Sequence, residues 1–120
     1  MMQNAVDIKN LSHYYGSYSV LKEISFSIPK GRFFIIIGPN GSGKTTLLKS
    51  ISGIEKARNE KLDILGKPIT EYSRRALART IALVPQMVTI DFPFTVMELV
   101  LMGRSPYLGI LGLEEEKDLE

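Results

Sequence analysis

Residues 38–46 read Gly-Pro-Asn-Gly-Ser-Gly-Lys-Thr-Thr and satisfy the pattern G-x-x-x-x-G-K-[ST]. The apolar run 33–37 before them is typical of a strand buried on both faces of a parallel sheet. Residues 45–52 after them predict a helix. This strand–loop–helix order constrains the fold most strongly, because it predicts an α/β domain with a phosphate-binding loop.

The loop suits a phosphate because its backbone can approach an anion closely. Glycines at 38, 41 and 43 allow conformations that are closed to residues with a Cβ atom. The helix that follows adds unpaired N–H groups and the positive end of its dipole. The alternative is an ordinary turn with good capping residues, but the fixed spacings and the Lys-Thr pair favour a triphosphate site.

Within this loop the expected roles divide by chemistry. Lys44 can reach the β- and γ-phosphates, the Thr45 hydroxyl can ligate Mg²⁺, and Thr46 is expected at the α-phosphate. Backbone N–H groups surround the remaining phosphate oxygens. The residues predicted to bind the nucleotide in this loop are Gly38, Pro39, Asn40, Gly41, Ser42, Gly43, Lys44, Thr45 and Thr46.

Composition limits the classes of partner. The 120 residues allow one domain at most, and 15 basic against 13 acidic residues give no electrostatic case for nucleic acid. The absence of cysteine excludes thiol chemistry and fits a cytosolic setting. No apolar stretch is long enough to span a bilayer, so any membrane connection is expected through a partner.

Periodicity and turn residues predict the remaining elements. Segments 6–11 and 24–28 alternate apolar and polar residues, as half-exposed antiparallel strands do. Residues 62–65 and 80–84 are predicted as further strands, the second one apolar, and residues 73–78 as a short helix.

Caps and charges predict where helices begin and end. Gly53 is expected to end the helix after the loop, and residues 55–61 to form a charged, solvated connection. Thr95 is predicted to cap a helix over 96–102, with Glu98 at its third position. Residues 114–120 resemble an acidic first helical turn.

A second metal-binding carboxylate does not stand out. Such a residue is expected at the end of another buried strand. Asp63 follows a strand that is too short, and Asp91 lies between Pro85 and Pro93, which favours an irregular segment. Both are interpreted as something other than a metal ligand, and Asp91 as a loop carboxylate in water.

Together these segments resemble the N-terminal half of an ATP-binding subunit of an ABC transporter. Residues 11–16 and 20–26 resemble the opening of that family, residues 38–46 its Walker A motif, and residues 83–86 its Q-loop. Residues 103–109, Gly-Arg-Ser-Pro-Tyr-Leu-Gly, narrow the resemblance to importers of the iron-siderophore, haem and cobalamin type. Related importers of other solutes carry similar segments.

The resemblance implies two further site residues. Tyr15 is placed to stack on the adenine, with Tyr14 and Tyr18 as competitors. Gln86 corresponds to the family's glutamine that approaches Mg²⁺ and the attacking water. The predicted catalytic residues are therefore Lys44 and Gln86, and the predicted metal ligands are Thr45 and Gln86. His13 is too early for the family's switch histidine and is predicted as a surface or strand-end residue. Ala57-Arg58-Asn59 departs from the usual Pro and Gly turn.

The fold that the resemblance implies is an α/β P-loop NTPase core with an N-terminal antiparallel β-subdomain. Residues 1–120 would form part of the ATP-binding domain and stop before the helical subdomain, which starts at about 95, is complete. Implied partners are ATP, Mg²⁺, a second ATP-binding subunit and transmembrane permease subunits, which would hold the protein at the inner face of the cell membrane.

Three other functions stay open. The signature motif, the Walker B glutamate and the switch histidine do not occur within the 120 residues, which fits a nucleotide-binding fragment without turnover. A soluble ABC-type ATPase acting on ribosomes or DNA is a second alternative, disfavoured by the near-neutral charge. A kinase or GTPase explains the loop but not Tyr15, Gln86 and residues 103–109 together, and no Asn-Lys-x-Asp run is present to read guanine.

Overall fold

The computed structural model describes residues 3–87 and 91–108, so the acidic turn expected at 114–120 lies outside the described residues. The chain divides into two compact units, residues 1–73 and 74–120. Each unit is described by itself below.

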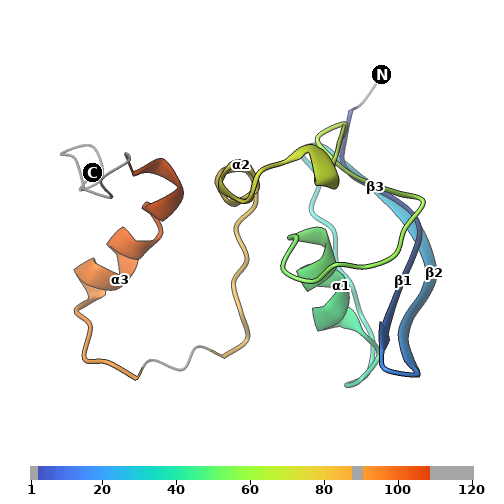
Figure 1. The fold of residues 1–120 in the computed structure, drawn as a ribbon, viewed down its shortest axis with the longest axis horizontal. Helices are drawn as coiled ribbons and strands as arrows, with labels where there is room; N and C mark the ends of the chain where they lie inside the picture. The colour runs from blue at the N-terminus through green and yellow to red at the C-terminus, as the bar shows by residue number, and fades with distance from the viewer. Residues whose placement is uncertain (1–2, 88–90, 109–120) are drawn as a thin grey trace. The chain divides into compact units, whose positions relative to one another are not determined.

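The first unit is built on a four-stranded antiparallel sheet with the order β2-β1-β3-β4 (Figure 1). Its strands are β1 (Asn4–Tyr15), β2 (Tyr18–Pro29), β3 (Lys61–Ile64) and β4 (Lys67–Pro68). The predicted strands at 6–11, 24–28 and 62–65 are confirmed, and the first two are longer than expected. Gly16, with a φ of 61°, makes the tight turn between β1 and β2.

The pairing of β1 with β2 shifts register at four places, and two of these shifts have a residue with a positive φ angle. Asn10, with a φ of 49°, lies at the shift between Ile8 and Leu11, and Glu23, with a φ of 47°, lies opposite the shift between Leu11 and His13. Each of these two bulges is held from the opposite strand, since Asn10 N donates to Ser25 Oγ and Glu23 N donates to Ser12 Oγ, both at 2.9 Å. The extra residue lets Ile8 and Leu11, three positions apart, both be buried.

Helix α1 (Lys44–Ile51) packs on one face of this sheet (Figure 1). It confirms the helix predicted after the phosphate-binding loop, and Gly53, in the left-handed region at a φ of 79°, follows its end as expected. The helix contributes Leu47 to a small apolar core. The buried apolar side chains are Ile8, Leu11, Leu21, Leu47, Leu62 and Ile64.

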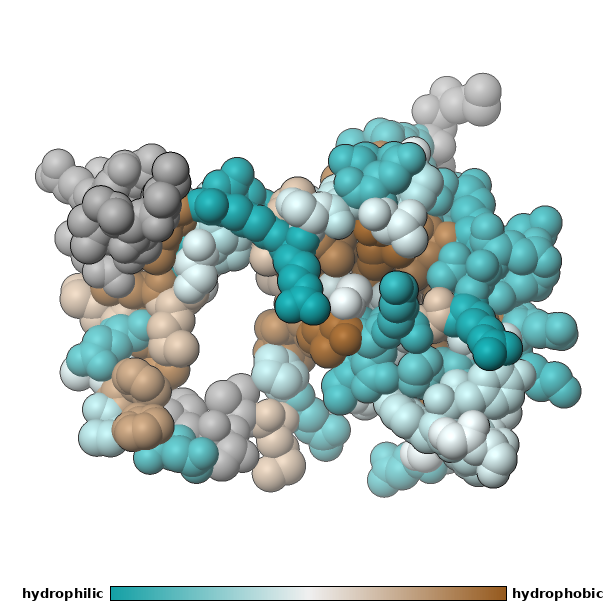
Figure 2. Space-filling view, in the orientation of Figure 1, coloured by the Kyte–Doolittle hydropathy of each residue, from teal (hydrophilic) through white to brown (hydrophobic). Residues whose placement is uncertain are grey.

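The other face of the sheet is hydrophilic. It includes the ion pairs Lys61–Asp7 at 2.8 Å and Lys9–Glu60 at 3.2 Å. Figure 2 shows this face as teal at the right-hand edge of the view. The alternation of buried and solvated residues along β1 and β3 therefore agrees with a sheet that is covered on one side only.

The prediction of a buried strand at 33–37 is wrong for this structure. The segment belongs to no sheet, and Phe33 and Ile37 are 91% and 89% exposed. A central parallel strand requires neighbouring strands for its backbone and helices for its faces. No strand in the described ranges 3–87 and 91–108 lies beside this segment. Phe34 stacks on Phe26 with ring centroids 5.4 Å apart.

The second unit begins with α2 (Arg74–Thr80), which confirms the predicted short helix. The strand predicted at 80–84 is wrong, because Thr80 ends α2, Ile81 N still bonds Leu77 O at 2.9 Å, and Val84 is 91% exposed without a sheet partner. As for residues 33–37, a buried strand would need neighbouring strands for its backbone and helices over its faces, and no strand in the described ranges lies beside residues 80–84.

Helix α3 (Val96–Met102) begins as predicted. The Thr95 hydroxyl accepts a hydrogen bond from Glu98 N at 3.2 Å. Apolar side chains of α3 remain exposed, including Val96, Met97 and Val100. Figure 2 shows brown and tan surface where α3 lies in Figure 1. The capping residues therefore fix this helix, not burial of its apolar side chains.

The turn η2 (Ser105–Tyr107) is tied to α2 by arginines. The Nε atoms of Arg75 and Arg79 donate to Pro106 O at 2.8 and 2.7 Å. The Tyr107 ring lies 4.2 Å from the Arg104 guanidinium and 5.1 Å from that of Arg79. These contacts give residues 103–108 a defined conformation within their own unit.

The first unit also contains the short 3-10 helix η1 (Ile69–Glu71), which follows β4.

The Asp7–Lys61 pair predicts how stability depends on pH. The Lys61 ammonium and then the Ser27 hydroxyl lower the pKa of Asp7 below 3.8. A carboxyl group whose pKa is lower in the folded chain than in the unfolded chain stabilises the fold at pH values above the unfolded-state pKa. This contribution disappears as the pH falls through the folded-state pKa. The free energy of unfolding of Asp7→Asn should therefore be below that of the original chain at neutral pH, and the gap should close in acid.

Urea unfolding at pH 7 and in acid measures this gap. Glu71→Gln is the control, because it removes a carboxylate of η1 that forms no ion pair within residues 3–87 and 91–108. A gap of the same size at both pH values would contradict a role for the Asp7 charge.

Candidate functional site: a phosphate-binding loop beside a tyrosine-bearing hairpin

The loop 38–43 is shaped by local backbone bonds and two left-handed glycines. Gly41 and Gly43 have φ angles of 83° and 95°. Ser42 N donates to Pro39 O at 3.2 Å, which closes the loop upon itself. The chain then enters α1 with Gly43 as its N-cap.

Gly43 is where the loop touches the sheet. A Cβ atom built on Gly43 would lie 2.9 Å from Leu21 Cδ2 and 3.0 Å from Val20 O. Only a residue without a side chain permits this close approach. The contact places the N-terminus of α1 directly against the start of β2, next to the turn of the hairpin.

The N-terminus of α1 offers an uncompensated positive end. Gly43 has no side chain that could cap the helix, and the first turn contains no acidic residue. The first intrahelical bond joins Leu47 N to Gly43 O at 2.9 Å, so the N–H groups of Lys44, Thr45 and Thr46 have no acceptor within the helix. This arrangement fits an anion.

Lys44 folds over the loop. Its ammonium donates to Pro39 O at 2.8 Å and to Gly38 O, and it lies 3.4 Å from Ser42 Oγ. The positive charge therefore lies over the loop, close to the helix N-terminus. Thr45 is exposed, so its hydroxyl is accessible to a metal ion, whereas Thr46 is buried at 9% exposure. The residues of this loop fit a magnesium-bound polyphosphate.

Tyr15 lies at the tip of the neighbouring hairpin. It pairs with Tyr18 across the turn and is half exposed. Its hydroxyl donates to Glu55 Oε1 at 2.9 Å, and its ring meets the His13 imidazole edge-on, with centroids 4.8 Å apart. Tyr14 and Tyr18 are also exposed, by 45% and 67%. The structure thus brings Tyr15 and the loop together in one unit.

Sequence reasoning missed the contacts of Glu55, and of the two positions predicted for His13 the structure shows the strand end, two residues before the last residue of β1. The Glu55 side chain is 23% exposed and the His13 side chain 12% exposed, so neither is a solvated surface group. His13 Nε2 lies 2.9 Å from Glu55 Oε2, an ion pair when the imidazole is protonated, although this nitrogen makes no hydrogen bond. Residue 55 is 40 positions from Tyr15, so no local pattern could reveal this contact.

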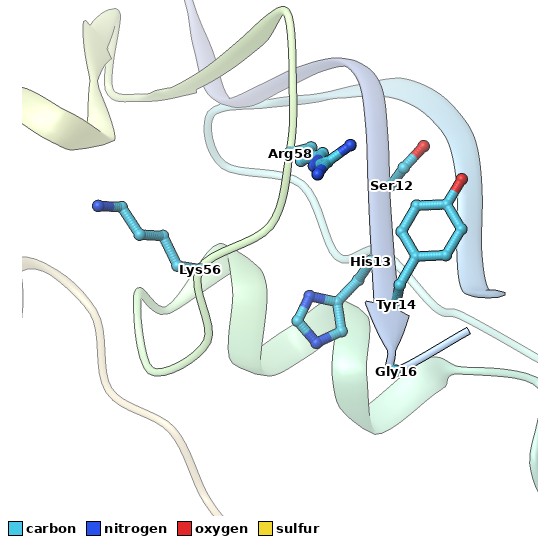
Figure 3. A pocket seen from close by; sticks show the side chains of 6 residues that line it. All are labelled: Ser12, His13, Tyr14, Gly16, Lys56 and Arg58. Atoms are coloured by element: carbon cyan, nitrogen blue, oxygen red, sulfur yellow. The ribbon is translucent and has the colours of Figure 1, made fainter. Parts of the chain in front are cut away.

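A cavity of about 350 Å³ opens beside the end of β1 (Figure 3). Its lining is polar and includes the basic residues Lys56 and Arg58, but Figure 3 shows the Lys56 ammonium pointing away from the other lining side chains. The Arg58 backbone bonds Ser12 in both directions, at 2.8 and 2.9 Å, which ties the loop after α1 to β1. The residues lining the cavity are Ser12, His13, Tyr14, Gly16, Lys56 and Arg58.

The remaining predicted residues lie elsewhere. Gln86 is exposed in a bend of the second unit, and its expected role beside the metal stays a prediction. Asp63 lies in β3 near Lys61, at 3.8 Å, and Asp91 is exposed. Among the described residues no three acidic, histidine or cysteine side chains form a metal-binding group.

Comparison with known proteins decides the family. A profile described as "ABC transporter" matches residues 21–119. The chain belongs to the ABC transporter family.

No helix in the described ranges has the length and apolar character that crossing a membrane requires.

Curated relatives of this ABC family chain include a probable iron chelatin transport ATP-binding protein of Helicobacter pylori, 36% identical over 96% of the chain and 46% of that protein. The hemin import ATP-binding protein HmuV of Thermobifida fusca is 35% identical over 85% of the chain and 36% of its own length. A solved metal-chelate type ABC transporter in an inward-facing conformation matches 98% of the chain and 41% of its own chain, with a TM-score of 0.75 and 29% identity. The chain spans less than half the length of these proteins.

The resemblance to the ABC family and the predicted fold class are therefore confirmed. The antiparallel N-terminal sheet with its helices matches solved ATP-binding subunits, including one with a TM-score of 0.74 and 26% identity. The predicted division of residues 1–120 into loop, Q-loop and the start of a helical subdomain remains a prediction.

The contact between Gly43 and β2 predicts unequal effects of two matched substitutions. Gly41→Ala and Gly43→Ala both force a side chain into the left-handed region, which costs about 1–2 kcal/mol. Only Gly43→Ala also meets Leu21 and Val20, because nothing lies within 4 Å of a Cβ at Gly41. Thermal unfolding should show the larger loss for Gly43→Ala. Equal losses would contradict the close contact.

Proposed function

We propose that this chain provides the ATP-binding face of a subunit that energises an ABC importer of iron chelates, of the siderophore, haem or cobalamin type. The observation that carries the proposal is the loop 38–46, where the Lys44 ammonium lies over the loop and the first N–H groups of α1 have no acceptor within the helix. The relatives named for iron chelatin and hemin support the class of solute.

In this proposal each part of the site has one task. Lys44 exchanges its contacts with loop carbonyls for the β- and γ-phosphates, which offer it full negative charges. The α1 N-terminus holds the phosphate oxygens and Thr45 ligates Mg²⁺. Tyr15 presents its ring to the adenine, and Gln86 acts near the metal and the attacking water.

The proposed partners follow from the family. A second ATP-binding subunit and transmembrane permease subunits would complete the transporter, and the permease would hold the chain at the inner face of the membrane. The relatives named as transport or import ATP-binding proteins support this assembly.

Removal of the Lys44 ammonium should weaken MgATP binding. A charged hydrogen bond to phosphate contributes roughly 1.5–3 kcal/mol, or about one to two factors of ten in Kd. Calorimetry of Lys44→Ala with MgATP measures this loss. Lys49→Ala, in the last turn of the same helix, removes an equal charge away from the loop and should bind normally. If both variants bound as the original chain does, ATP binding at this loop would be ruled out.

Thr45→Ala should remove the part of ATP affinity that depends on Mg²⁺, because it deletes the proposed metal ligand. Titration of ATP with Mg²⁺ and with a chelator gives this difference directly. Thr45→Ser keeps the hydroxyl and should keep the magnesium effect. An equal loss with and without Mg²⁺ would contradict the role of Thr45.

A further inference from the structure

The Tyr15 ring is fixed at its hydroxyl end. The bond from Tyr15 Oη to Glu55 Oε1 is 2.9 Å long, and His13 touches the ring edge-on. His13 and Tyr15 are two positions apart on β1, whereas Glu55 follows α1. The three side chains form a cluster that we call the tyrosine clamp, defined as His13, Tyr15 and Glu55.

Glu55 itself is placed by the backbone on both sides. Ile54 N and Glu55 N donate to Lys49 O at 2.9 and 3.1 Å, which ties the residue to the end of α1. Three residues later, Arg58 pairs with Ser12 of β1. The carboxylate therefore stands on a loop that is fixed to the helix and to the strand, and its position does not depend on its own side-chain contacts alone.

The three residues of the tyrosine clamp differ in how far they are buried. Glu55 and His13 are 23% and 12% exposed at their side chains, whereas Tyr15 as a residue is 50% exposed. A mostly buried carboxylate requires hydrogen-bond donors or positive charge. The Tyr15 hydroxyl supplies a donor to Glu55 Oε1, and His13 Nε2 lies 2.9 Å from Glu55 Oε2. Half of Tyr15 stays exposed, so its ring can meet a flat ligand.

We propose that Glu55 is a positioning residue that holds the Tyr15 ring in the orientation that the nucleobase requires. This inference rests on the proposed function, in which Tyr15 stacks on adenine. A free tyrosine side chain loses rotational freedom when a base stacks on it. Glu55 fixes that side chain before the ligand arrives, so the loss on binding is smaller.

The test separates the base from the phosphates. Binding of MgATP and of magnesium tripolyphosphate is measured for the original chain, Glu55→Ala, Tyr15→Phe and the double variant. Glu55→Ala and Tyr15→Phe should each weaken MgATP binding roughly three- to tenfold, as expected when one side chain must be ordered on binding. Tripolyphosphate, which has no base, should bind unchanged. The double variant should be no weaker than the single ones, because both changes break the same bond.

Glu60→Ala is the matched control. Glu60 also contacts β1, through Lys9 at 3.2 Å and Asn10 at 2.8 Å, but lies away from the hairpin tip. Its removal should leave both ligands unaffected. This variant reports whether loss of any carboxylate beside β1 has the same effect.

Several outcomes would overturn the inference. Equal weakening of both ligands by Glu55→Ala would make Glu55 merely structural, unchanged MgATP binding would make it irrelevant, and a double variant weaker by the product of both factors would separate the two residues. A weakening by Glu60→Ala as large as that by Glu55→Ala would remove its specificity. Tyr15→Ala distinguishes failure of the Glu55 positioning role from failure of the proposed stacking by Tyr15. If Tyr15→Ala leaves MgATP affinity unchanged, the stacking role is wrong, and the positioning role of Glu55 is wrong with it.

Discussion

The close contact between Gly43 and the start of β2 is the constraint on which the rest of the first unit depends. Gly43 ends the phosphate-binding loop, begins α1 and touches Val20 and Leu21 of the sheet. These three connections meet at one residue. The helix N-terminus that carries Lys44 therefore lies against the strand that follows the hairpin turn beside Tyr15.

The predictions that succeeded rest on signals between near neighbours. The Thr95–Glu98 cap, the glycine after α1 and the loop 38–46 are each encoded within a few residues. Chemistry at such short range does not need the rest of the fold. For this reason the helix limits could be predicted from the sequence, and the loop together with residues 11–16, 20–26, 83–86 and 103–109 indicated the family that the comparison shows. The roles of the site residues stay predictions.

The predictions that failed depend on distant partners. Residues 33–37 and 80–84 have the composition of buried strands, but composition does not supply the neighbouring strands that such segments need. Glu55 shows the opposite case, a residue predicted as solvated that reaches Tyr15 and His13 across 40 positions of sequence. In both cases the environment is set by tertiary pairing, which the local pattern does not contain.

The serines that hold the two bulges have a consequence for distance. Each serine meets the amide of its bulge only in the observed register, since Ser25 faces Asn10 and Ser12 faces Glu23. A slip of the hairpin by two residues would carry its tip roughly 7 Å along the strand direction. Ser12 and Ser25 thus stabilise the register that places Tyr15 at the hairpin tip. They do so from positions at which neither serine touches the loop 38–43.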